Sequence, residues 1–189
     1  MNVAPTRLDG VLLLQPTVFH DDRGFFFESY NQRVFEAAVG ATVRFVQDNH
    51  SRSSKGVLRG LHFQRSPHAQ GKLVRVVQGS VFDVVVDMRP GSATFGSWVS
   101  VELSAENQQQ LWVPGGLAHG FIVTSDAADV LYKTTAHRFA PSEGVIRWDD
   151  RDLAIGWPIA GPGPIVSAKD AAAGSFRDAV AAQMYGNGP

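Results

Sequence analysis

The chain contains no cysteine among its 189 residues. This absence excludes disulfide bonds, thiolate metal sites and a cysteine nucleophile. No apolar run approaches the roughly 18 residues that a membrane-spanning helix needs. The first ten residues, MNVAPTRLDG, lack the basic and then apolar pattern of a secretion signal. We therefore expect a soluble, cytoplasmic protein.

The chain also has no surplus of charge of either sign. It carries 17 Lys and Arg against 18 Asp and Glu, a formal net charge of -1. Nucleic acid and membrane surfaces are therefore not expected partners, whereas a small anionic substrate needs only a few well-placed cations. With no internal repeat and no convincing linker, residues 1–189 are predicted to form a single domain, which at this length can bury a sizeable core.

The usual histidine spacing of a metal site is missing as well. Histidines occur at positions 20, 50, 62, 68, 119 and 137, without a His-x-His or His-x-x-x-His pair. β-Barrel metalloenzymes usually combine such a pair with a nearby carboxylate. Only a scattered pair of His62 and His119 remains for a metal, so the sequence predicts no metal site.

The central part of the chain is rich in β-branched and aromatic residues and is interrupted by turn signals at short intervals. The predicted strands are 43–51, 57–64, 72–78, 81–88, 97–103, 110–113, 120–124 and 130–135, with shorter pieces at 11–14 and 25–27. Gly79 and Ser80 predict a tight hairpin between the third and fourth strands. So many short strands favour a closed or double-sheet β architecture, which holds its ligand at the mouth.

Two helices are predicted outside this β region. Residues 31–39 begin with the capping residue Asn31, place apolar residues at helical spacing and stop at Gly40. Near the end of the chain, residues 175–184 have apolar side chains along one side. Both helices are expected to be peripheral.

The stretch GVLRGLHFQ, residues 56–64, places Arg59 and His62 in an apolar strand. A lone histidine there is more often a satisfied core residue than a general base. Arg59 and His62 are three residues apart, so a regular strand would point them to opposite faces. A bulge at Gly60 would bring both side chains to one face, a common use of a strand glycine beside a site.

Further polar side chains interrupt the other apolar strands. Burying any of them without a partner would cost about 1 to 3 kcal/mol. They are Gln47, Asn49, Lys72, His119, Tyr132 and Lys133. Each alone is compatible with an exposed or edge position. Together they favour a polar cavity inside the β structure.

Eight motifs in order identify a family resemblance over nearly the whole chain. They are DDRGFFFE (21–28), QDNHSRS (47–53), GVLRGLHFQ (56–64), GKLVRVVQGSVFDVVVDMRPGSATFG (71–96), LWVPGGLAHGF (111–121), VLYKTT (130–135), IRWDDRDLAIGWP (146–158) and VSAKD (166–170). The chain resembles the dTDP-4-dehydrorhamnose 3,5-epimerase family. The resemblance implies a mainly β, cupin-type jelly roll with short peripheral helices, a homodimer, and no metal or organic cofactor. It also implies a dTDP-linked 4-keto-6-deoxyhexose as substrate.

The resemblance assigns roles to residues of this chain. His62 is expected to be the base, Asp170 the carboxylate that orients its ring, and Lys72 the donor to the enolate oxygen, with His119 nearby. Residues that resemble groups holding the diphosphate and nucleotide are Arg23, Gln47, Asn49, Arg59 and Lys169. Further expected substrate contacts are Phe26, His119, Tyr132 and Phe139. Glu28 resembles a group that contacts the base from the partner subunit.

One departure from the family pattern concerns the second proton. The family places a tyrosine in a Tyr-x-Pro element shortly after YKTT, on the sugar face opposite the histidine. The stretch here is AHRFAP, so Phe139 occupies that place, and counting from YKTT gives Arg138 instead. His137, Tyr132 or a water molecule is then left as the donor. This substitution allows an epimerase acting at only one carbon, an inactive sugar-nucleotide-binding homologue, or a keto-sugar isomerase.

Overall fold

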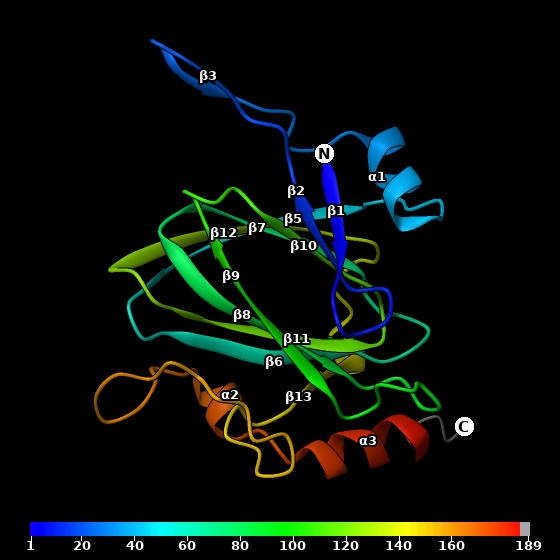
Figure 1. Ribbon diagram of the computed structural model, residues 1–189. Helices are drawn as coiled ribbons and strands as arrows, with labels where there is room; N and C mark the ends of the chain where they lie inside the picture. Colours follow the sequence, from blue (N-terminus) through cyan, green and yellow to red (C-terminus); the bar gives the residue numbers. More distant parts are fainter. Residues whose placement is uncertain (186–189) are drawn as a thin grey trace.

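The computed structural model describes residues 1–185 as two antiparallel β-sheets that face each other (Figure 1). The first sheet has the order β1 (Asn2–Pro5), β2 (Leu12–Gln15), β10 (Gln110–Val113), β7 (Lys72–Gln78), β12 (Ala127–Thr134), β5 (Gln47–Ser54). The second has the order β13 (Glu143–Val145), β6 (Leu58–Gln64), β11 (Leu117–Val123), β8 (Ser80–Asp87), β9 (Trp98–Ser104). The predicted mainly β, double-sheet architecture is confirmed.

A short hairpin stands apart from these sheets. Its strands are β3 (Phe19–Asp21) and β4 (Gly24–Phe26), which pair only with each other. Figure 1 shows the hairpin extending away from the body of the molecule, beyond the side that carries β2 and α1. Phe19, Phe25 and Phe26 are 63%, 60% and 71% exposed. A hairpin of this length gains little stability alone. Phe25 stacks on Phe27, yet all three rings remain mostly exposed, which is unusual for large apolar side chains.

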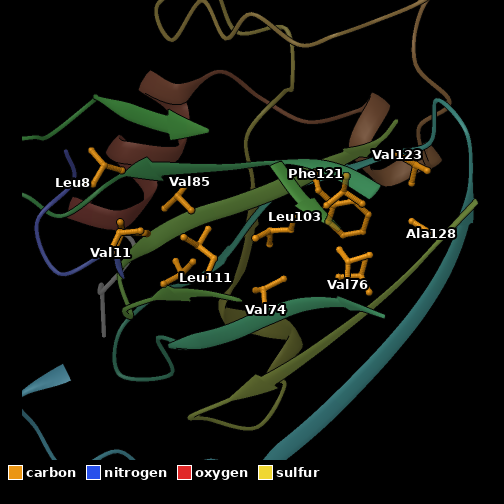
Figure 2. Close-up of a cluster of buried hydrophobic side chains, with 14 residues drawn as sticks. Leu8, Val11, Val74, Val76, Val85, Leu103, Leu111, Phe121, Val123 and Ala128 are labelled. Atoms are coloured by element: carbon orange, nitrogen blue, oxygen red, sulfur yellow. The ribbon is translucent and has the colours of Figure 1, made fainter. Parts of the chain in front are cut away.

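The main core fills the space between the sheets because alternate residues of each strand point inward. Val74 and Val76 of β7 face Val85 of β8 and Phe121 of β11 in one buried cluster, shown in Figure 2. Leu73, which precedes Val74 and points the other way, packs on the outer side of the first sheet with Phe35 of α1 (Gln32–Val39). The first sheet is therefore covered on both of its faces over part of its area.

The predicted helices are confirmed. Asn31 caps α1 by accepting a hydrogen bond from the Val34 backbone N–H, and Gly40 ends the helix with a φ of 73°. The C-terminal segment carries α2 (Ala168–Ala171) and α3 (Phe176–Tyr185) across the outer face of the second sheet (Figure 1). Phe176 packs in the outer cluster with Val84 and Ile122. Among residues 1–185, no helix is long and apolar enough to cross a membrane.

The predicted hairpin at Gly79 and Ser80 is wrong. β7 pairs with β10 and β12, whereas β8 pairs with β11 and β9 in the other sheet. Gly79 therefore carries the chain from one sheet to the other. Its φ is 71°, and a Cβ atom there would lie 2.0 Å from the carbonyl oxygen of Ala127. Only glycine fits here, because the chain passes close to the Ala127 backbone with a positive φ. A Gly-Ser pair in a tight hairpin has the same conformational requirement, so the sequence alone does not distinguish the two.

Candidate active site

A cavity of about 570 Å³ lies between the two sheets, beside the main core. Lys72 lines it at the start of β7, and the next inward residues of that strand, Val74 and Val76, belong to the core. The expected site residues that line this cavity are Gln47, Asn49, Arg59, His62, Lys72, His119, Tyr132, Lys169 and Asp170. The expected polar cavity is thus formed by residues from both sheets and from α2.

His62 forms a short hydrogen bond with Asp170. The distance from His62 Nε2 to Asp170 Oδ1 is 2.6 Å. The Asp170 side chain is 3% exposed, and that of His62 is 41% exposed. Burial alone would raise the pKa of Asp170, but the hydrogen bonds from His62 and from the Gly60 backbone N–H lower it below its usual value. Asp170 therefore stays ionised, and the His62 Nδ1 atom is left to accept a proton.

The side chains of Arg59 and His62 share the cavity because β6 contains the predicted bulge. Along β11, His119 pairs with His62 and Phe121 pairs with Arg59, so three steps on β6 match two on β11. Gly60, with a φ of 136°, makes this possible, since a Cβ atom there would lie 2.5 Å from the Gly120 Cα. The two glycines let the strands approach closely at the bulge.

His119 is buried beside a carboxylate that we did not predict. Its Nε2 lies 2.9 Å and 2.8 Å from the two carboxylate oxygens of Asp83 on β8. Asp83 is fully buried and shares the inward face of β8 with Val81 and Val85. The signal was present in the sequence, because a carboxylate at an inward position of an apolar strand requires a partner.

Lys72 provides a buried cation on the opposite sheet. It is 8% exposed, and its Nζ atom donates to the backbone carbonyl of His62 at 3.3 Å. Burial lowers the pKa of Lys72 from 10.5 to about 8, although the negative charge of Asp83 acts to raise it. Lys72 therefore remains largely protonated at neutral pH and can stabilise a negative oxygen in the cavity.

Tyr132 reaches the cavity from β12 in the first sheet, whereas His62 comes from β6 in the second. The two side chains thus enter the cavity from opposing walls. Burial raises the pKa of Tyr132, with Arg59 opposing and Glu143 adding to the shift. The phenol is therefore protonated at neutral pH and is able to donate a proton.

The wall around Arg59 offers polar groups from β5. Arg59 Nε donates to the Ser53 hydroxyl at 2.9 Å, and Gln47 Nε2 donates to Asn49 Oδ1 at 2.8 Å. Ser51 also lines the cavity, and its buried hydroxyl has no hydrogen-bond partner. These donors and acceptors suit a ligand with several oxygens.

Phe139 does not line the cavity, although it was an expected substrate contact. Its ring is 42% exposed and stacks on the His68 ring, with centroids 4.1 Å apart. The neighbouring Arg138 lines the cavity instead. Gln64 fixes this loop, since its amide donates to the carbonyls of His68 and His137 and accepts from the Phe139 N–H.

The structure separates Arg23, Phe26 and Glu28 from the other expected site residues. None of the three lines the cavity, and the Arg23 side chain is 89% exposed beside Asp21. Arg23 and Phe26 belong to the projecting hairpin, and Glu28 follows it. Glu28 accepts a hydrogen bond from Asn31 at the start of α1.

Several cavity residues were not predicted. They include Ser51, Gln64, Gln70, Glu143 and Ser167. Gln64 follows His62 by two residues on the same strand, so its inward direction follows from strand periodicity. Glu143 lies on the short strand β13, which no sequence pattern indicated. Within residues 1–185, no group of three or more His, Asp or Glu side chains is arranged to hold a metal ion.

Comparison with known proteins identifies the family of this chain. The family model described as dTDP-4-dehydrorhamnose 3,5-epimerase matches residues 5–178. The chain belongs to this epimerase family. The dTDP-4-dehydrorhamnose 3,5-epimerase of Shigella flexneri is 56% identical over 179 residues, which are 95% of this chain and 98% of that protein.

Solved structures of the epimerase family have the same fold, so the expected cupin-type jelly roll is confirmed. The dTDP-6-deoxy-D-glucose-3,5-epimerase of Legionella pneumophila, in complex with dTDP-4-keto-L-rhamnose, has a TM-score of 0.89 and 51% identity, covering 93% of both chains. A variant of ChmJ, a 3'-monoepimerase from Streptomyces bikiniensis, was solved with dTDP. In it one histidine is replaced by asparagine and one tyrosine by phenylalanine. It has a TM-score of 0.87 and 30% identity, covering 98% of this chain and 91% of that chain.

Proposed function

We propose that this chain epimerises a dTDP-linked 4-keto-6-deoxyhexose at C3 and C5, without a metal, through an enolate. The hydrogen bond between His62 and Asp170, in a cavity that also holds the Lys72 cation, carries this proposal. A proton next to a ketone is weakly acidic, so its removal requires a base near the carbon and a positive group near the oxygen. His62 and Lys72 provide these two groups.

In the proposed reaction, His62 Nδ1 takes the proton from the carbon next to the ketone. The C–H bonding electrons form the carbon–carbon double bond of the enolate, and the carbonyl electrons move to the oxygen. Lys72 stabilises this oxygen, while Asp170 stabilises the imidazolium of His62. Return of a proton to the other face of the carbon restores the ketone with inverted configuration.

Tyr132 is the proposed donor of that second proton. It extends from the sheet opposite the one that carries His62, and its raised pKa keeps the phenol protonated. The ChmJ variant offers independent support, because its replaced histidine and tyrosine are separated in sequence by the same number of residues as His62 and Tyr132. With Tyr132 in this role, Phe139 is no reason to restrict the reaction to one carbon.

The proposed active form is a homodimer in which each hairpin completes the site of the other copy. Arg23 and Phe26 are exposed on a hairpin that extends away from its own sheets. A two-fold axis would give each cavity the same residues from its partner. We propose that Arg23 then contacts the diphosphate, and that Phe26 and Glu28 contact the nucleoside.

Solvent exchange tests the proposed reaction. The keto-sugar nucleotide is incubated with the protein in deuterium oxide, and H3 and H5 are followed by NMR. Deuterium at both carbons together with inverted product is expected. Binding without exchange at either carbon would leave an inactive homologue, and movement of the carbonyl from C4 to C3 would identify an isomerase. Exchange and inversion at one carbon would identify a mono-epimerase.

A further inference from the structure

The mouth of the cavity contains one carboxylate that is shared by two cations. Glu143 Oε1 accepts a hydrogen bond from Arg138 Nε at 2.6 Å, and Glu143 Oε2 accepts one from Lys169 Nζ at 2.7 Å. All three residues line the cavity. The Glu143 side chain is 21% exposed, whereas those of Arg138 and Lys169 are 64% and 55% exposed. The carboxylate thus lies on the inner side of its cations.

The three residues are held by different parts of the fold. Glu143 starts β13 and pairs with Gln64 of β6. Arg138 belongs to the loop after β12, where its backbone N–H donates to Gln47 Oε1 at 3.2 Å. Lys169 lies on α2, next to Asp170. The positions of Arg138 and Lys169 are therefore supported by contacts other than those with Glu143.

The remaining two cations of the cavity are not bound to a carboxylate. Arg59 donates to the Ser53 hydroxyl, and Lys72 donates to the His62 carbonyl. Arg59 and Lys72 thus have no bound carboxylate that competes with an anionic ligand. At the mouth, in contrast, Glu143 cancels one of the two positive charges of Arg138 and Lys169. This arrangement lowers the attraction for anions at one end of the cavity only.

We propose that Glu143 is a specificity-determining residue that disfavours free nucleoside diphosphates relative to the sugar-linked substrate. The inference rests on the proposed function. The diphosphate of a sugar nucleotide has no terminal phosphate, whereas a free nucleoside diphosphate gains close to one further negative charge at neutral pH, since the second phosphate pKa is about 6. A fixed carboxylate repels the more highly charged ligand more strongly.

Glu143 remains ionised over the working range of the site. Hydrogen bonding from Arg138 lowers the pKa of its carboxyl group, burial opposes this shift, and Lys169 adds to it. Because the carboxylate holds its cations by three hydrogen bonds, two from Arg138 and one from Lys169, a ligand phosphate has to compete with Glu143 for both of them. Removing the Glu143 charge is therefore expected to free both cations for phosphate.

The test is isothermal titration of dTDP and of dTDP-glucose, a sugar nucleotide without the reactive ketone, into the wild type and Glu143→Gln. Glu143→Gln is expected to tighten dTDP binding about fivefold and dTDP-glucose binding at most about twofold, the scale of a partly exposed ion pair. Glu143→Asp keeps the charge and should retain the wild-type preference. Glu106→Gln makes the same charge change at an exposed position outside the cavity and should alter neither affinity.

Other results would overturn the inference. Weaker binding of both ligands by Glu143→Gln would assign the carboxylate a purely structural role, and an equal gain for both would remove any part in discrimination. If the wild type binds neither ligand, the proposed function itself is wrong. If it binds both and Glu143→Gln leaves their ratio unchanged, only the inference about Glu143 fails.

Discussion

His62 Nε2 lies 2.6 Å from Asp170 Oδ1, and the two residues are 108 positions apart in sequence. The strand β6 supplies the ring and the short helix α2 supplies the carboxylate. Ser167 caps this helix by accepting a hydrogen bond from the Asp170 backbone N–H. The cap fixes the position of the carboxylate, and the carboxylate in turn orients the ring of His62.

Replacing the proposed base tests its role directly. His62→Ala is expected to lower kcat by about 10² to 10⁴, the usual contribution of a positioned base, while the Kd for dTDP remains nearly unchanged. Asp170→Asn should also lower kcat, because an amide cannot stabilise the imidazolium as a carboxylate does. Turnover by NMR and dTDP binding by calorimetry measure the two effects. A loss of less than tenfold for His62→Ala would assign the proton transfer to another group.

Tyr132→Phe and Phe139→Tyr distinguish the two candidate positions for the second acid. Tyr132→Phe is expected to retain deuterium exchange at the carbon next to the ketone and to lose most of the inverted product, because His62 still removes the proton. Phe139→Tyr is expected to change neither, since this ring stacks on His68 outside the cavity. A gain of inversion in Phe139→Tyr would instead show that the loop reaches the substrate.

The lowered pKa of Lys72 predicts an alkaline limit to activity. Only the protonated amine can stabilise the proposed enolate oxygen, and the pKa of Lys72 is about 8. We therefore expect kcat to fall as the pH rises through about 8, and pH profiles of kcat measure this limb. An activity that stays constant to pH 10 would exclude the charged lysine from the rate-determining step.

The buried charge of Lys72 is also expected to lower the stability of the fold, although the proposed reaction requires it. The pKa of Lys72 is lower in the folded chain than its ordinary 10.5, so the buried charge costs folding free energy below about pH 8. This cost disappears as the pH rises toward 10.5. Lys72→Met should therefore raise the free energy of unfolding at pH 7 by about 1 to 3 kcal/mol and abolish turnover. Urea unfolding measures the change, and a gain that persists at pH 10.5 would contradict its electrostatic origin.

Mixing two inactive variants tests the shared site of the proposed dimer. In a homodimer of the Arg23→Ala variant, both sites lack Arg23. In a homodimer of the His62→Ala variant, both sites lack His62. In a mixed dimer, one cavity combines an intact His62 with the intact Arg23 of the other subunit. Unfolding the two variants together and refolding them should therefore restore activity to about a quarter of the sites. No recovery, with dimers present by light scattering, would mean that each hairpin serves its own chain.

The sequence predicted the parts of this structure that depend on local patterns. Asn31 and Gly40 delimit α1 because capping involves neighbouring residues only. The bulge at Gly60 was predictable because a strand glycine separates Arg59 from His62. The hairpin at Gly79 was mispredicted, since the choice of sheet for β8 depends on long-range pairing with β11.

The missed site residues have the same explanation. The role of Asp83 depends on the pairing of β8 with β11, which places its carboxylate beside His119. The position of Glu143 at the mouth of the cavity depends on the pairing of β13 with β6. Tyr132 was expected to contact substrate, but its position across from His62 requires both sheets. Motif matching, in contrast, directed attention to Phe139, which the loop turns toward His68.

The bulge in β6 also fixes the spacing of two cavity side chains. Gly60 brings Arg59 and His62 to the same side of one strand, so the span between the proposed diphosphate contact and the proposed base is set by the backbone. A regular strand would point these two side chains to opposite faces. The spacing between anion binding and proton abstraction is therefore a property of the main chain, which side-chain substitutions elsewhere in the cavity leave unchanged.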